Sequence, residues 1–217
     1  SKASGQATVA VGKESNASGS SAISAGYQSA AAGDNAVAVG KNTTAGATNA
    51  IAVGLRATAT GTRAIATGAG SSATGEQSLA NGFTAKASGE NSIAQGNAAN
   101  ASAANATAIG TESTASGQYA TALGTASNAT AIHTVAIGSA STASKDGAFA
   151  GGYNSTAAGK KSVALGFNAQ ANNENDVALG AGSITKVAVA NPNQTFLGKR
   201  YVFAGGSPSS VVSIGSD

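Results

Sequence analysis

The chain has 217 residues, of which 41% are hydrophobic, 10% are charged and 4% are aromatic, and its formal net charge is +3. Cysteine, methionine and tryptophan are absent, and only two prolines occur. So few bulky residues exclude a conventional globular core, and no apolar run is long enough for a membrane-spanning helix. The basic residues are thinly dispersed, which argues against nucleic acid as a partner.

Glycine recurs at every fourteenth position from Gly12 to Gly180, thirteen times without a miss. Each of these glycines closes an alternating segment such as residues 35–40, and a polar segment such as residues 15–19 follows half a period later. Alternation predicts two short strands per unit. Thirty glycines and few charges exclude a heptad coiled coil. The repeat therefore predicts an all-β chain that winds as a β-solenoid with 14 residues per turn, its strands stacked in parallel register.

Two columns of the repeat are almost pure alanine. One runs from Ala3 to Ala171 and the other from Ala10 to Ala178, with Ser24 as the single exception. Turns this short bring their two strands closer than the roughly 10 Å of ordinary sheet packing, so only small side chains fit between them. We expect both alanine columns to fill the interior and the remaining columns to point outward.

The outward positions of the first strand carry large apolar side chains, whereas those of the second are polar. Full burial of one such side chain is worth roughly 1.5–3 kcal/mol, so a monomer is not expected to leave them all in water. We expect identical rolls to meet along this face with closed rotational symmetry, in two, three or four copies. The predicted interface residues are Val9, Val11, Ile23, Val37, Val39, Ile51, Val53, Ile65, Leu79, Ile93, Ile109, Leu123, Val135, Ile137, Phe149, Val163, Leu165, Val177 and Leu179.

The recurring Asn-Ser/Ala-Val/Ile-Ala-x-Gly strand, followed by an Ala-x-Gly segment, resembles the head domain of YadA-like trimeric autotransporter adhesins of Gram-negative bacteria. The resemblance covers residues 1–180, although Thr107 and Thr121 replace the Val/Ile and Lys145 and Asn173 replace second-strand glycines. It implies a left-handed parallel β-roll that forms a homotrimer. It also implies a cell-surface location, with a stalk and an outer-membrane anchor that this sequence does not include.

Beyond Gly180 the fourteen-residue register stops. We expect residues 1–180 to form the β-roll and residues 181–217 to form the insert that heads of this family carry before the neck, with residues 212–215 as one more strand. Ser1 in place of a methionine indicates a piece of a longer protein.

A column directly after the glycines holds candidate ligand contacts, Tyr27, Phe83, Tyr153 and Phe167, together with Leu55. Edge aromatics can contact a ligand, but they can equally seal the groove between subunits. In the apolar column, Thr67, Asn81 and Gln95 are successive polar replacements. Three copies of each could ring an axis and hold water or an anion, or they could mark a wetter stretch of packing.

No catalytic, metal or cofactor constellation emerges from the sequence. The only histidine, His133, falls in a turn column that elsewhere carries Asn, Gln, Arg or Lys, so it is expected to be exposed. The carboxylates are too dispersed for an acid/base pair or a calcium loop. No glycine cluster is followed by Lys-Ser/Thr, so a phosphate loop is not expected either.

These observations favour a non-enzymatic adhesin head that binds host extracellular matrix, host-cell surfaces or neighbouring bacteria through repeated weak sites. The resemblance suggests collagen, fibronectin or laminin as ligand classes. An ice-binding solenoid would need a flat threonine ladder, and only one Thr-x-Thr occurs among the first six second-strand turns, at Thr58 and Thr60. A purely structural spacer also stays open. A polysaccharide-processing β-helix would need longer turns and clustered acids.

Overall fold

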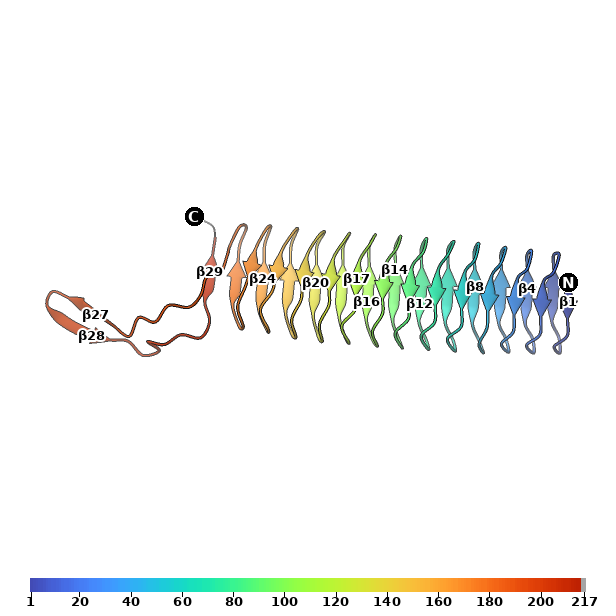
Figure 1. Cartoon of the computed structure of the whole chain (residues 1–217), viewed down its shortest axis with the longest axis horizontal. Helices are drawn as coiled ribbons and strands as arrows, with labels where there is room; N and C mark the ends of the chain where they lie inside the picture. Colours follow the sequence, from blue (N-terminus) through green and yellow to red (C-terminus); the bar gives the residue numbers. More distant parts are fainter. Residues whose placement is uncertain (216–217) are drawn as a thin grey trace.

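The computed structural model describes residues 1–215, and Figure 1 shows them as a rod of stacked turns from which a hairpin projects at the C-terminal end. Each turn contributes one strand to each of two parallel sheets, which run along the rod. Residues 1–215 contain no helix, and hence none that could cross a membrane. The predicted all-β parallel solenoid is confirmed.

The sheet that carries the apolar positions has fourteen strands. They are β2 Val9–Val11, β4 Ile23–Ala25, β6 Val37–Val39, β8 Ile51–Val53, β10 Ile65–Thr67, β12 Leu79–Asn81, β14 Ile93–Gln95, β16 Thr107–Ile109, β18 Thr121–Leu123, β20 Val135–Ile137, β22 Phe149–Gly151, β24 Val163–Leu165, β26 Val177–Leu179 and β29 Val212–Ile214. We call it the apolar sheet.

The opposite sheet has thirteen shorter strands, and we call it the polar sheet. Its strands are β1 Lys2–Ala3, β3 Asn16–Ala17, β5 Ala30–Ala31, β7 Thr44–Ala45, β9 Thr58–Ala59, β11 Ser72–Ala73, β13 Lys86–Ala87, β15 Asn100–Ala101, β17 Thr114–Ala115, β19 Asn128–Ala129, β21 Thr142–Ala143, β23 Thr156–Ala157 and β25 Gln170–Ala171.

The register of both sheets follows the repeat. Ala66 pairs with Ala52 on one side and with Ala80 on the other, each fourteen residues away. Every strand inside the rod is therefore hydrogen-bonded to the turn before it and the turn after it. Thirteen turns at a strand spacing of about 4.8 Å give a rod about 60 Å long.

The corners of each turn need backbone conformations that most residues avoid. A left-handed residue occurs every seventh position, for example Asn35 and Asn49 with φ of 57° and 59°. Asparagine and glycine adopt this conformation most readily. The column glycines are fixed by close approach as well: a Cβ on Gly54, whose φ is 133°, would lie 2.6 Å from the carbonyl oxygen of Gly68 in the next turn. The fourteen-residue glycine period is thus a requirement of stacking.

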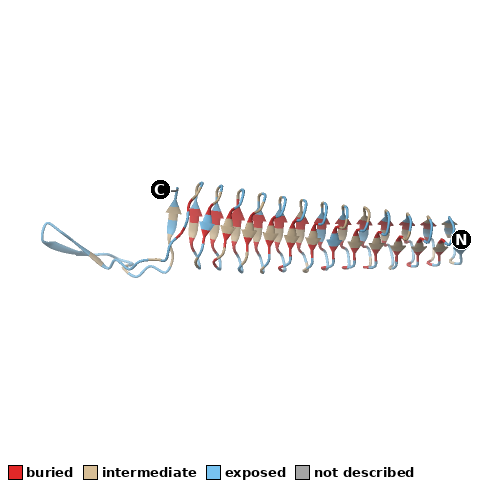
Figure 2. Ribbon diagram, turned by 45° about the horizontal axis from the view of Figure 1, so that its top comes forward, coloured by how far each residue is buried: buried red, intermediate tan, exposed pale blue. Residues whose placement is uncertain are grey.

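The interior of the rod is filled by alanine, as predicted. Ala17, Ala66 and Ala178 have no exposed surface, while Ala3 and Ala10 in the first turn are less covered because no turn precedes them. Figure 2 shows buried residues along the rod and an almost entirely exposed hairpin.

The prediction that all remaining columns point outward is wrong for two of them. The residues that follow the left-handed corner positions, such as Ser71 and Ala36, are also buried. The corner turns their side chains inward, and their hydroxyls find partners there: Ser71 Oγ donates to the Gly68 carbonyl at 2.9 Å and Ser92 Oγ to the Gly89 carbonyl at 2.6 Å. Ser71 and Ser92 therefore pack inside with their hydroxyls paired.

The coil continues for half a turn past Gly180, where Ile184 bridges Gln170. The chain then leaves the rod, forms the antiparallel hairpin of β27 Asn193–Phe196 and β28 Lys199–Val202, and returns as β29 beside β26. The extra strand predicted at residues 212–215 is present.

Candidate functional site

The outer face of the apolar sheet carries two columns of mostly large apolar side chains, which we call the apolar stripe. In the strands of this sheet from β4 to β26 the middle residue is buried and lies between two outward positions, as in β8 with Ala52 between Ile51 and Val53. None of the nineteen predicted interface residues is buried; eleven are exposed and eight are half-buried. Stacking on neighbouring turns covers part of each side chain, and the rest meets solvent in the single chain.

Besides Ala25 in β4 and Thr107 and Thr121 in β16 and β18, two places interrupt the apolar stripe. At β10, β12 and β14 its second column carries Thr67, Asn81 and Gln95, and Thr67 Oγ1 lies 3.0 Å from Asn81 Oδ1 in a hydrogen bond that the hydroxyl donates. At β22 the ring of Phe149 covers Gly151, where an added Cβ would lie 2.8 Å from Phe149 Cε1. The stripe is therefore not identical from turn to turn.

The four candidate ligand contacts lie at the corner that follows each apolar strand. All four side chains are exposed, and the rings of Tyr153 and Phe167 stack with their centroids 5.4 Å apart. Tyr27 lies between two ammonium groups, with Lys13 Nζ 5.9 Å and Lys41 Nζ 5.7 Å from its ring centroid. The structure thus brings Tyr153 and Phe167 together and leaves Phe83 and Tyr27 on separate turns of the same corner.

The opposite corner carries a second aromatic stack. His133 is exposed, as predicted for a turn residue, and its ring lies parallel to that of Tyr119 at a centroid distance of 4.9 Å. Ile132 beside it is also exposed. Sequence reasoning did not single out Tyr119, although its position fourteen residues before His133 places it in the same column.

Charged groups form few contacts on this surface. Within residues 1–215 the ion pairs are Arg63 with Glu76 at 3.7 Å and Lys13 with Glu14 at 3.9 Å, and all four side chains are largely exposed. In the same part of the chain no group of three His, Cys, Asp or Glu residues is arranged to hold a metal ion. The surface thus presents repeated polar and aromatic side chains with few ion pairs.

One buried carboxylate was missed by the sequence analysis. Asp176 occupies a column that elsewhere carries Ala, Ser or Thr, and that departure was the available signal. Its Oδ1 accepts the Val211 amide at 2.9 Å, and its Oδ2 accepts the backbone and side-chain amides of Asn173 at 3.1 and 2.9 Å. Burial tends to raise the pKa of Asp176, but hydrogen bonds from Thr185, Val211 and Asn173 outweigh it and lower the pKa below 3.8. Asp176 thus ties the returning strand to the last full turn.

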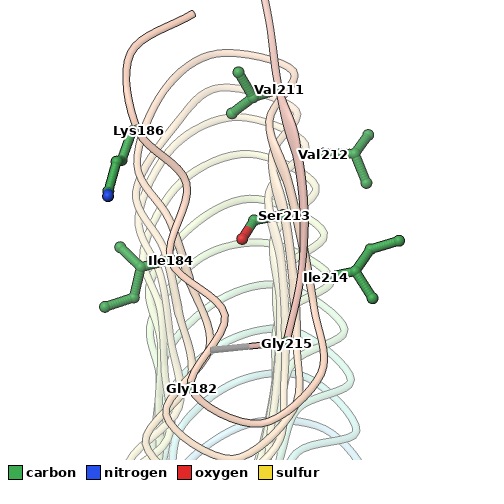
Figure 3. Close-up of a pocket in the computed structure, with 8 residues that line it drawn as sticks. All are labelled: Gly182, Ile184, Lys186, Val211, Val212, Ser213, Ile214 and Gly215. Atoms are coloured by element: carbon green, nitrogen blue, oxygen red, sulfur yellow. The ribbon is translucent and has the colours of Figure 1, made fainter. Parts of the chain in front are cut away.

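The C-terminal end of the rod is an open depression of about 490 Å³, which Figure 3 shows in close-up. Ser213 points into the coil, whereas Val212 and Ile214 point away from it and extend the apolar stripe by one turn. Ser183 Oγ lies 2.7 Å from the Leu179 carbonyl and 3.0 Å from the Gly215 carbonyl. The depression lies where no further complete turn covers the last turn of the rod within residues 1–215.

Comparison with known proteins relates these repeats to one family. The family model described as YadA head domain repeat (2 copies) matches residues 3–29, 17–43, 45–71, 73–99, 87–113, 115–141, 129–155 and 157–183. No curated protein matches the chain.

Two solved structures are similar to parts or all of the chain. The collagen-binding domain of the Yersinia adhesin YadA is 21% identical, with 98% of this chain and 82% of that chain covered and a TM-score of 0.32. The C-terminal YadA-like domain of a Burkholderia pseudomallei protein is 37% identical over 37% of this chain, with a TM-score of 0.27, and this chain spans only 34% of its length. The repeat matches extend over most of the rod, so the chain is a repetitive adhesin-type head and belongs to the YadA head family.

Proposed function

We propose that three copies of this chain assemble around an axis parallel to the rod, with their apolar stripes facing one another. The observation that carries the proposal is the stripe itself, nineteen large apolar residues on one face with none buried in the single chain. A stripe that runs the full length of a rod is covered by rotational symmetry without leaving unpaired copies. Membership of the YadA head family supports three as the number of copies.

Light scattering measures the mass of the particle in solution, and with 20.3 kDa per chain it distinguishes a monomer, a dimer and a trimer. We expect three times this mass for the native chain and a lower mass for Leu123→Asp, which places a carboxylate within the stripe. Ser116→Asp is the matched control, since Ser116 is exposed at the end of a polar-sheet strand and is expected to keep the native mass. A stable native monomer would contradict the proposal.

The assembled head is an adhesive surface for host extracellular matrix or host cells, or for neighbouring bacteria in autoagglutination. Repeated corners on three identical chains multiply weak contacts, so binding depends on the assembly more than on any one site. Its place is the bacterial surface, held at the outer membrane by segments outside this sequence. Collagen, fibronectin and laminin are the ligand classes to screen first, on surfaces coated with each and on cultured cells.

Within that surface, the exposed aromatics at Tyr27, Phe83, Tyr153 and Phe167 are the proposed ligand contacts. We expect Tyr153→Ala with Phe167→Ala to weaken capture on the best matrix ligand several-fold without lowering the melting temperature. The matched control is Tyr119→Ala with His133→Ala, which removes the stack at the opposite corner. If the first pair lowers the melting temperature and leaves capture unchanged, these rings seal a subunit groove and bind no ligand.

The same screen separates the adhesive role from its rivals. If the head is only a spacer, the trimer will bind none of the matrix proteins and no cells. An ice-binding solenoid would show thermal hysteresis, for which the irregular outer positions Asn16, Ala30, Thr44 and Lys86 of the polar sheet are poorly suited.

A further inference from the structure

The three polar residues Thr67, Asn81 and Gln95, which we call the polar ladder, occupy the second column of the apolar stripe on consecutive turns. They are directly in register, since Thr67 pairs with Asn81 and Asn81 with Gln95 across parallel strands. Asn81 and Gln95 are exposed, and the column continues as Val53 before the ladder and as Ile109 after it. The ladder is thus a polar island near the middle of an otherwise apolar column.

A perfectly repeated stripe would leave the alignment of associating chains poorly defined. Displacing one chain along its partner by one turn, about 4.8 Å, would exchange apolar contacts for similar apolar contacts and lose only the last turn. Repetitive strands specify register weakly for this reason. Side chains that differ from one turn to the next are needed to align equivalent turns of the associating chains.

We propose that the polar ladder sets the register and the parallel direction in which copies of this chain associate. The inference rests on the assembly proposed above. In a level parallel arrangement each ladder residue faces its own copies, whose hydroxyl and amide groups supply donors and acceptors. A displacement of one turn places Thr67 of one chain against Val53 and Gln95 of the other against Ile109, and a displacement of three turns leaves every ladder residue against an apolar one, which buries polar groups without partners.

The ladder also discriminates against antiparallel pairing. When the thirteen column positions from Val11 to Leu179 overlap fully in opposite directions, Thr67 faces Leu123 and Asn81 faces Ile109, while only Gln95 meets its own copy. A single buried polar residue fixes the register of coiled coils in the same way, at some cost in stability. We infer that the sequence keeps three polar residues in this column because they exclude wrong alignments.

Disulfide cross-linking between introduced cysteines measures the register of associated chains. The chain has no cysteine of its own, so no other disulfide interferes. Ile137→Cys and Leu165→Cys lie in the same column two turns apart, about 10 Å, which is too far for a disulfide between level chains. Tagged Leu165→Cys chains co-expressed with Ile137→Cys chains should therefore form disulfides between like positions only.

The decisive variant moves the ladder by two turns in the Ile137→Cys chain. Its substitutions are Val39→Thr, Val53→Asn, Thr67→Gln, Asn81→Val and Gln95→Ile. Aligning the moved ladder with a native ladder brings the introduced cysteine at position 137 of one chain level with the introduced cysteine at position 165 of the other. We expect at least a tenfold rise in the cross-position disulfide, or else no mixed assemblies in a tag pull-down. Mixed assemblies without the cross-position disulfide would overturn the proposal.

A second variant covers the case in which the moved ladder does not assemble. Thr67→Val, Asn81→Val and Gln95→Ile erase the ladder from both cysteine chains and should raise the cross-position disulfide several-fold over the native pair. An unchanged disulfide pattern in an assembled erased variant would refute the ladder alone. A native chain that is monomeric in light scattering would instead refute the assembly, and the ladder with it.

Discussion

The rod and the hairpin that leaves it use their side chains in opposite ways. The rod buries alanines and serines, and its strands gain hydrogen-bonded neighbours on both sides. The hairpin of β27 and β28 has large apolar side chains, yet Leu197 is 91% exposed and Val202 is 76% exposed. Small residues inside a repeated hydrogen-bond ladder are thus fully buried, whereas the larger side chains of the hairpin have no core to enter. An isolated two-stranded hairpin is marginal in water, which fits this contrast.

The largest loss of stability is expected when a side chain is added to one of the glycines that recur every fourteen residues in the rod. Gly54→Ala adds a Cβ 2.6 Å from the Gly68 carbonyl oxygen at a φ of 133°, so we expect it to lower the unfolding free energy by about 3 kcal/mol or more. Gly198→Ala in the hairpin turn meets nothing within 4 Å and should cost about 1 kcal/mol for its φ of 78°. Urea unfolding at one chain concentration compares the two, and equal costs would contradict the stacking argument.

Overpacking the interior should be the next largest effect. Ala31→Val adds two methyl groups to a fully buried position of β5 and is expected to cost about 1–3 kcal/mol. Its neighbour Ala32 is exposed, so Ala32→Val is expected to stay within about 0.5 kcal/mol of the native chain. Thermal unfolding followed by circular dichroism distinguishes them. A tolerated valine at position 31 would mean that the interior has free space.

The junction between the two regions should depend on Asp176. Asp176→Asn removes a charged acceptor of three amide hydrogen bonds and should cost about 1.5–3 kcal/mol, with the loss concentrated in β29. Hydrogen exchange at the Val211 amide measures that local loss. Asp146→Asn, at an exposed corner, is the control and should leave Val211 protected.

The same carboxylate predicts a pH dependence. Its pKa is lowered in the folded chain, so its stabilising contribution is complete above the unfolded value of about 3.8 and is lost as the pH falls through the lower folded value. Protection of the Val211 amide should therefore decrease on acidification below about pH 3.8 in the native chain. Asp176→Asn should show no such decrease, and an equal decrease in both proteins would assign the effect to other groups.

The smallest effect is expected from the apolar side chains of the hairpin. Leu197→Ser with Val202→Ser should change the unfolding free energy of the rod by no more than about 0.5 kcal/mol, because both side chains are exposed. Thermal unfolding at matched chain concentration checks this. A loss above about 1 kcal/mol would show that the hairpin packs against another part of the assembly.

The sequence alone determined the turn length, the two strands per turn, the parallel register and the alanine interior. The glycine column from Gly12 to Gly180 and the alanine columns repeat at a constant spacing, so the sequence predicts the same backbone path for every turn. The extra strand at residues 212–215 was also predictable from its alternation. The outward position of the apolar stripe followed from the same period. That the stripe packs against two further copies of the chain is a proposal.

The tertiary structure decided what the repeat does not encode. The inward turn of Ser71 and Ala36 depends on the left-handed corner before each of them, a backbone feature that column chemistry does not reveal. Asp176 acquires its role only when Val211 returns from thirty-five residues away. A period fixes contacts between neighbouring turns because they repeat, whereas contacts made once, across the insert, exist only in the folded chain.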